Sequence, residues 1–382
     1  MAIQNQNELK ATQLAKLNRI LASDQHLETL DDLAKLPVLR KDALLKRQSE
    51  NPPFGGVAVQ SPANIFQSPG PIYEPGGQGK DWWRFGRFLA AMGCDDTDIA
   101  QNTFAYHFTP AGAMFESAAR SVGTTVFPAG PGNTRQQAEV AAAIGTTIYV
   151  GTPDYLGTIL AKADELGLDL RRIDKAAVSA GPLFPQLRQA YEDRGIMCRQ
   201  CYGTADVGLI AYETAASIDG MVIDDDVIVE IVMPGTGTPL PDGEVGEVLV
   251  TVLNPDYPLI RFSVGDLSAI VPRAAGDDTS PNKIVGWRGR ADQATKVKGM
   301  FIRPEQVAKL MSLNPDITRA RIEVDFDGSR DKITVKIEGG QPETIQASVA
   351  EILKLNAVVV KVADGELPRD GVLVSDLRPV GG

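Results

Sequence analysis

Short apolar runs and longer amphipathic segments alternate along the chain from about residue 80 to residue 203. Each short run ends on Gly or Pro, as buried strands often do, whereas the longer segments repeat apolar residues every three or four positions, as helices do. The predicted strands lie within 124–130, 146–153, 175–181 and 196–203, and the predicted helices within 82–93, 113–123, 134–145, 154–167 and 185–195. This alternation predicts a mostly parallel sheet covered by helices.

The pattern changes after residue 215. A β-rich stretch of about 216–288 follows, joined by the turn "PGTGTPLPDG", and it predicts an antiparallel or barrel-like subdomain. Beyond it, two helical and three strand patterns predict a small α+β unit. We therefore expect an α/β protein with a large domain over 1–289, which opens with helices, and a small domain over 290–382. The hinge is expected near Arg290–Asp292.

Composition excludes several classes of protein. The chain has 382 residues, 43% of them hydrophobic, a net charge of -11 and a pI near 4.9. Such an acidic chain is a poor general binder of nucleic acid or anionic membrane, since both need a basic surface. No apolar run reaches the ~18 residues of a membrane span, and the first residues lack the pattern of a signal peptide. We expect a cytoplasmic protein.

Cys198 and Cys201 form a C-x-x-C pair, which occurs in redox and zinc sites. The pair lies in a predicted strand, where residues three apart face opposite sides. The chain has one other cysteine, Cys94, and two histidines, His26 and His107. We therefore interpret the pair as part of a buried strand.

Three segments contain candidate binding residues. "VSAG" (178–181) and "YGTADVG" (202–208) each follow a predicted strand, and ligands of parallel sheets bind at the carboxyl ends of strands. "RFSVGDL" places Asp266 in a glycine turn, where a carboxylate can accept hydrogen bonds from ribose hydroxyls. "GRADQATKVKG" (289–299) carries basic residues that could bind phosphate or ribose.

Together with "DLAKLPVLRKDALLK", "PFGG", "GTTVFPAGPGNTRQQ" and "PLPDGEVGEVLV", these motifs resemble the adenylate-forming ligases, most closely the phenylacetate–coenzyme A ligase branch. The resemblance spans nearly the whole chain and implies a two-domain fold whose small domain rotates between two half-reactions. A carboxylic acid, expected to be aromatic, would react with ATP and Mg²⁺ to give an acyl-adenylate. Coenzyme A, or an amine or hydroxyl, would then displace AMP. A homodimer is compatible with the resemblance.

The resemblance also implies roles for individual residues. Asp206 falls where the family has a magnesium-binding Glu, Tyr202 would stack on adenine, and Asp266 would hold the ribose. Arg290 would contact ribose or phosphate, and His107, in "YHFTPAGAM", would lie nearest the acid. The remaining nucleotide-site residues are Ser179, Ala180, Gly181, Gly203, Thr204, Ala205, Lys296 and Lys298. Aromatic residues of the acid pocket would include Phe104, Tyr106, Phe108 and Phe115.

Ordinary structural roles compete with each assignment. Asp206 could cap a helix that begins at Val207, because Asp is favoured at that position. Asp266 could be a simple turn acid, and the basic residues of 289–299 could form a solvated face. His107 could be a core histidine, and Tyr202 and Phe104 could be core aromatic residues.

Two departures from the family bear on adenylation. The phosphate loop is replaced by "FQSPGPIYEPGGQGK", which is shorter and contains Pro69 and Pro71, neither of which can donate an N–H group. The lysine near the end of the family's chains is replaced by Val372 or Leu373. "SAGP" also has Gly181 where relatives often have an acid.

Three hypotheses remain open: an acid ligase, an enzyme of the acyl-transfer half-reaction alone, and a non-catalytic binding protein for a nucleotide or acyl metabolite.

Overall fold

The structure is a computed structural model of the whole chain. It describes residues 5–22, 25–57, 61–68, 70–274, 276–291, 295–297, 300–326, 331–368 and 372–378. The chain divides into two compact units, one of Met1–Val264 and Ala269–Gly286, the other of Gly265–Ser268 and Trp287–Gly382. Among the described helices, none combines the length and apolar character that a membrane crossing requires.

An eight-stranded mixed sheet forms the centre of the first unit, with the strand order β13-β9-β8-β7-β6-β5-β3-β4. Neighbours from β4 to β7 pair in parallel, and those from β7 to β13 pair antiparallel. The strands are β3 (Ile99–Asn102), β4 (Thr125–Pro128), β5 (Ile148–Gly151), β6 (Lys175–Val178), β7 (Met197–Thr204), β8 (Gly208–Thr214), β9 (Ser217–Ile223) and β13 (Lys283–Ile284).

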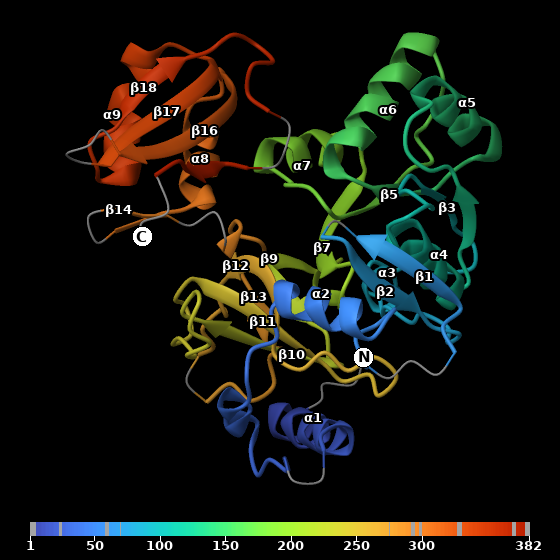
Figure 1. Cartoon of the computed structure of the whole chain (residues 1–382). Coiled ribbons are helices and arrows are strands. Elements are labelled where there is room, and N and C mark those ends of the chain that lie inside the picture. Colours follow the sequence, from blue (N-terminus) through green and yellow to red (C-terminus); the bar gives the residue numbers. More distant parts are fainter. Residues whose placement is uncertain are drawn as a thin grey trace. The chain divides into compact units, whose positions relative to one another are not determined.

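Helices cover this sheet because their apolar faces need burial (Figure 1). They are α3 (Gly86–Ala91), α4 (Ala111–Ser121), α5 (Thr134–Ile144), α6 (Pro153–Leu166) and α7 (Pro185–Glu192). Two apolar cores lie against the strands, one around Phe88 and Phe115 and the other around Tyr149 and Leu156. Helix α3 is shorter than the predicted range of 82–93. Asp81 and Arg84, which precede it, have positive φ angles of 52° and 70°.

The β-rich stretch supplies a second, three-stranded sheet with the order β10-β11-β12. Its strands are β10 (Val227–Val232), β11 (Gly246–Val252) and β12 (Phe262–Ser268). A two-stranded antiparallel hairpin of β1 (Asn64–Ser68) and β2 (Ile72–Gly76) lies beside helix α2 (Lys41–Glu50) (Figure 1). Helix α1 (Gln6–Ile20) and the 3-10 helix η1 (Leu30–Lys35) precede α2.

The second unit is an α+β fold with its own apolar core. A four-stranded sheet has the order β18-β17-β16-β19, and β14 pairs with β15 in a separate hairpin. The elements are β14 (Thr295–Val297), β15 (Met300–Ile302), α8 (Pro304–Leu313), β16 (Ile317–Phe326), β17 (Asp331–Gly339), α9 (Pro342–Leu353), β18 (Val358–Lys361) and β19 (Val374–Asp376). The expected hinge at 290–292 stays a prediction, and Asp292 lies outside the described residues.

The predicted α/β fold is confirmed, and so is the interpretation of the cysteines. Cys198 and Cys201 both lie in β7, but Cys198 packs in the core around Tyr149 and Cys201 in the core around Phe115. Both thiols are free, and burial raises the pKa of each to about 12. A buried thiol of this kind is a poor nucleophile and a poor metal ligand at neutral pH.

Candidate functional site

Asp206 lies in the tight turn of the hairpin formed by β7 and β8, in which Thr204 pairs with Gly208. The alternative that Asp206 caps a helix is therefore wrong, because the chain continues as a strand after the turn. The strong β pattern of "GLIAYET" is the physical reason. Strands β6 and β7 are parallel neighbours, so the turn after β7 lies at the same edge of the sheet as the end of β6.

The two glycines of this turn are required by close backbone contacts. A Cβ atom on Gly203 would lie 2.6 Å from the carbonyl oxygen of Gly208 and 2.7 Å from Phe85. Gly208 has a φ of 77°, and a Cβ there would lie 2.8 Å from the carbonyl oxygen of Trp83. The segment that precedes α3 thus packs directly against the turn.

The Asp206 side chain is 1% exposed and points at a lysine. Lys41 Nζ, at the start of α2, lies 3.1 Å from Asp206 Oδ2. The other carboxylate oxygen, Asp206 Oδ1, is buried without a hydrogen-bond partner among the described residues. An unsatisfied buried acceptor costs about 1–3 kcal/mol, so this oxygen is suited to an added ligand.

A second buried carboxyl group, Glu74 on β2, lies in the same region. Ser68 donates its hydroxyl hydrogen bond to Glu74 Oε1, and Glu74 Oε2 is buried without a partner in the described structure. Burial, helped by the charge of Asp206, raises the pKa of Glu74 to about 8, although the Ser68 hydrogen bond and Lys41 oppose the rise. Tyr257 is buried nearby, and its hydroxyl has no partner among the residues that the structure describes. Burial, then the charges of Asp206 and Glu74, raise the pKa of Tyr257.

The β1–β2 hairpin occupies the place in the sequence where the family's phosphate loop is expected. Ser68 pairs with Ile72, so the connection is the three residues 69–71. Residues 77–80, which follow, form a loop as predicted. Together with Lys16 and Asp256 they line a cavity of about 580 Å³ that none of the predicted site residues borders.

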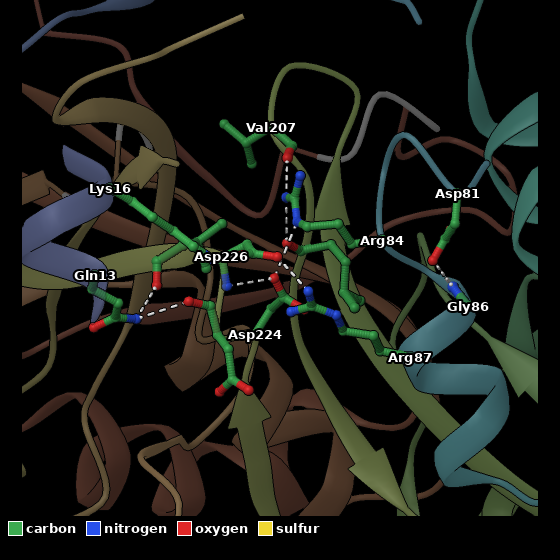
Figure 2. Close-up of polar contacts among 12 residues, drawn as sticks. Gln13, Lys16, Asp81, Arg84, Gly86, Arg87, Val207, Asp224 and Asp226 are labelled. Carbon is green, nitrogen blue, oxygen red and sulfur yellow. Dashed lines mark hydrogen bonds and ion pairs between the residues drawn. The ribbon is translucent and has the colours of Figure 1, made fainter. Parts of the chain in front are cut away.

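Arg84 connects the back of the Asp206 turn to a buried ion cluster. Its Nη2 donates to the carbonyl oxygens of Val207 at 2.7 Å and Leu209 at 3.0 Å, and its Nε lies 3.1 Å from Asp224 Oδ1. Figure 2 shows Arg84 and Arg87 converging on Asp224. Helix α1 reaches the same cluster from the other side, since Lys16 pairs with Asp226 and Gln13 donates to the backbone at 225 and 227 (Figure 2).

The segment after β6 forms the neighbouring edge. Ser179 Oγ donates to the carbonyl oxygen of Cys201 at 3.0 Å, which ties this segment to β7. Ala180 is exposed and has a φ of 59°, a strained conformation for a non-glycine residue that is common at functional sites. Gln200 donates to the carbonyl oxygen of Gly181 at 3.1 Å. The predicted edge of Ser179–Gly181 and Tyr202–Asp206 is therefore built by adjacent parallel strands.

His107 is exposed, so its interpretation as a core histidine is wrong. Its neighbour Phe108 is 73% exposed, and the carbonyl oxygen of Phe108 accepts a hydrogen bond from Gln67 on β1 at 2.8 Å. Phe104 and Phe115 instead stack on each other at 4.9 Å inside the core. Of the aromatic residues predicted for an acid pocket, Phe108 is thus available to a ligand and these two are not.

The second unit brings Asp266 and Arg290 together. The two residues form an antiparallel bridge, and Arg290 Nη1 lies 3.4 Å from Asp266 Oδ1. Trp287 Nε1 donates to the same oxygen at 3.1 Å. Arg290 is therefore not a merely solvated charge, and Asp266 belongs to a strand instead of a simple turn. Lys296 lies in β14, and Lys298 lies outside the described residues.

Val372 and Leu373 occupy the place where the resemblance predicts the family's C-terminal lysine. Leu373 packs against the core of the second unit, and its carbonyl oxygen accepts a hydrogen bond from Ile322 at 2.9 Å. The absence of a lysine at 372–373 is thus matched by a packing role for the residue that replaces it.

The carboxylates of Asp206 and Glu74 are the candidates for a metal site in the first unit. No group of three or more His, Cys, Asp or Glu side chains in the described ranges is arranged around a metal position. Mg²⁺ in nucleotide enzymes is commonly held by one or two carboxylates, with water and substrate phosphates completing the shell. The unpartnered oxygens of Asp206 and Glu74 fit that kind of partial protein site.

Comparison with known proteins identifies the class. Residues 87–252 match the family model described as AMP-binding enzyme. The chain is 31% identical over 350 residues to a phenylacetate-coenzyme A ligase of Aromatoleum evansii, covering 85% of this chain and 78% of that one. It is 29% identical over 331 residues to the enzyme of the same name from Escherichia coli strain K12, covering 81% and 74%.

A solved structure agrees with the fold. An open conformation of 2-hydroxyisobutyryl-CoA ligase, in complex with 2-HIB-AMP and CoA, superposes with a TM-score of 0.77 at 19% identity, over 96% of this chain and 90% of that one. The family-model match and the identity to the ligase of Aromatoleum evansii define an adenylate-forming enzyme. More narrowly, the chain belongs to the phenylacetate–coenzyme A ligase family.

Sequence reasoning missed three residues that the structure places around the Asp206 turn. Lys41 lies in "LPVLRKDALLK", a segment that supported the family resemblance without a role for any one residue. Glu74 is an acid in an otherwise apolar strand pattern, and that was the available signal. Arg84 lies between two aromatic residues, and nothing in its local sequence indicated a contact with residues 207 and 209.

Proposed function

We propose that this chain activates a carboxylic acid with ATP and transfers the acyl group to coenzyme A. In the first step a carboxylate oxygen attacks the α-phosphorus of ATP, and pyrophosphate leaves with the electrons of the broken P–O bond. In the second step the thiol attacks the acyl carbon, loses its proton, and AMP leaves. The observation that carries the proposal is the similarity to a phenylacetate-coenzyme A ligase over 85% of the chain.

The roles of individual residues are part of this proposal. Asp206 accepts a cation at the nucleotide phosphates, while Tyr202 and the backbone of 203–205 line the nucleoside. Ser179–Gly181 forms the adjacent wall. In the second unit Asp266 binds ribose, and Arg290 contacts ribose or phosphate. The Arg290–Asp266 pair, with its N···O distance of 3.4 Å, orients both groups before a ligand binds.

Mg²⁺ bound at the Asp206 carboxylate would neutralise phosphate charge during adenylation. The chain's own residues prepare the position: Lys41 holds one oxygen of Asp206, and Arg84 fixes the backbone on either side of Gly208. His107 and Phe108, exposed beside the β1–β2 hairpin, are the residues we assign to the acid. An aromatic acid suits an exposed aromatic side chain at this place.

A second candidate is an enzyme of the acyl-transfer half-reaction alone, acting on a preformed adenylate or acyl-CoA. The three-residue connection of the β1–β2 hairpin and the apolar residue at position 373 favour it. Both changes remove groups that serve the triphosphate and the reacting carboxylate, and a well-placed charge there can contribute several kcal/mol to the barrier.

One screen separates these functions. Purified full-length protein is given ATP, Mg²⁺ and a panel of aryl and alkyl acids, with and without coenzyme A, and pyrophosphate and AMP are measured. Acid-dependent pyrophosphate release supports the ligase. Thioester formation from a synthetic acyl-adenylate, without pyrophosphate release from any acid, supports the second candidate. Nucleotide or acyl-CoA binding without turnover would contradict both.

We also propose a cytoplasmic location and a homodimer, both carried over from the family resemblance. Cell fractionation and light scattering on the purified chain test these two statements. An amine or hydroxyl in place of coenzyme A is tested in the same screen by acceptor competition.

A further inference from the structure

Three buried oxygen atoms without hydrogen-bond partners lie around the Asp206 turn in the described structure: Asp206 Oδ1, Glu74 Oε2 and the hydroxyl oxygen of Tyr257. Each belongs to a residue no more than 5% exposed. Buried polar atoms are normally satisfied by protein or ordered water. A group of three in one place therefore indicates a ligand position.

The two carboxyl groups are brought together by separate elements of the first unit. Asp206 lies in the β7–β8 turn and Glu74 on β2, while Lys41 at the start of α2 contacts Asp206. Their neighbours pack together, because Ile72 of β2, Val207 of the turn and Tyr257 belong to one apolar core. Opposing buried carboxylates repel each other unless a cation or a proton lies between them.

Glu74 and Asp206 each have one carboxylate oxygen in a described contact and one that is available to a ligand. Ser68 donates to Glu74 Oε1 and Lys41 pairs with Asp206 Oδ2, so the second oxygen of each carboxylate remains available. Ionised carboxylates accept and do not donate hydrogen bonds, and hard divalent cations prefer such oxygens. If Glu74 gives up its proton when a cation binds, Lys41 offsets one of the two negative charges and the cation offsets the other.

We propose that Glu74 is a second carboxylate ligand, beside Asp206, for the divalent cation of this enzyme. The β1–β2 hairpin would then provide a metal ligand in the part of the sequence where the family's phosphate loop is expected. The inference rests on the proposed use of Mg²⁺ and ATP. It gives this chain a means of holding the metal–triphosphate that depends less on backbone N–H groups.

The test measures metal binding without turnover. Mn²⁺ is titrated into the full-length chain without nucleotide, free Mn²⁺ is followed by electron paramagnetic resonance, and excess Mg²⁺ tests displacement. We expect wild type to bind one Mn²⁺ that Mg²⁺ displaces, and both Glu74→Gln and Asp206→Asn to weaken binding by about tenfold or more. Glu74→Asp, which keeps the charge but shortens the arm, should fall between wild type and Glu74→Gln.

The matched control is Asp81→Asn. Asp81 also has a buried carboxylate oxygen without a partner in the described structure, but it accepts from the backbone of Gly86 and lies near Arg84 and Arg87. The Mn²⁺ affinity of the Asp81→Asn variant should equal that of wild type. Circular dichroism and melting temperature check that each variant is folded, and if Glu74→Gln does not fold, Glu74→Asp decides.

Two results would overturn the proposal: no Mn²⁺ bound by wild type, as expected if the position holds only a buried water, or equal affinity in wild type and a folded Glu74 variant. The proposed function fails separately. Loss of Mn²⁺ binding in Glu74→Gln, with no pyrophosphate release by wild type from any acid, would uphold the metal site and reject the ligase. Pyrophosphate release by wild type, with Mn²⁺ affinity unchanged in Glu74→Gln, would uphold the ligase and reject the metal site.

Discussion

Lys41 Nζ lies 3.1 Å from Asp206 Oδ2, joining the first residue of α2 to the turn between β7 and β8. The carboxylate is 1% exposed and the lysine 35% exposed, so the pair has a buried acid and a base that reaches solvent. Removing the Lys41 ammonium group would leave the buried Asp206 carboxylate without this ion pair. We therefore expect Lys41 to stabilise the turn.

Lys41→Met should lower the free energy of unfolding by about 1–3 kcal/mol, less than for a fully buried pair because Lys41 is partly solvated. Urea denaturation measures the change. Lys46→Met on the same helix is the control, since Lys46 is 77% exposed and its contact to Glu50 spans 3.9 Å; its effect should stay within about 0.5 kcal/mol. Equal effects of the two variants would refute the role of Lys41.

Asp206→Asn and Asp266→Ala should each reduce adenylate formation sharply, by about a hundredfold or more if a charge that stabilises the transition state is lost. Single-turnover pyrophosphate release measures this step. Asp169→Asn is the control, because Asp169 is exposed and pairs locally with Arg171. Full activity in both site variants would remove the site assignment.

Arg84→Met should destabilise the first unit by about 3–5 kcal/mol, since it leaves the buried Asp224 carboxylate with one partner fewer and two carbonyl oxygens unsatisfied. Thermal and urea unfolding measure the effect. Arg171→Met, at an exposed arginine, should be nearly neutral. A loss below about 1 kcal/mol would mean that the Arg84 contacts add little.

Asp81 predicts a pH dependence of stability. Burial raises its pKa from 3.8 to about 6 in the folded protein, so the folded state holds more protons than the unfolded state between these values. Stability from this group therefore falls as pH rises from about 4 to 6. Asp81→Asn keeps an oxygen for the Gly86 N–H and should remove this slope. The difference in melting temperature between wild type and variant, followed from pH 4 to 7, should increase in favour of the variant; a constant difference would contradict the prediction.

The parallel part of the fold could be predicted because its signals are local. The segments around α4 to α7 have helical spacing and end near Gly residues, and the strands between them are short and apolar. The glycines of the 202–208 turn are a local signal of the same kind, because they indicate close backbone contact, and Gly203 and Gly208 make such contacts.

The neighbours of that turn could not be predicted from local sequence. Lys41, Glu74 and Arg84 come from a helix, a hairpin and a loop far from Asp206 along the chain, and only the tertiary fold brings them together. Asp206 itself was ambiguous, because Asp suits both a helix N-cap and a tight turn. The β-rich residues after Gly208 decided for the turn.

The most direct test of the account is detection of the adenylate itself. Wild type and Asp206→Asn are incubated with ATP, Mg²⁺ and the best acid of the screen, without coenzyme A, and the products are analysed by mass spectrometry alongside pyrophosphate. Wild type should give acyl-AMP and pyrophosphate in equal amounts, and Asp206→Asn should give much less of both. Pyrophosphate and acyl-AMP absent from wild type with every acid, in a folded protein that binds nucleotide, would contradict it.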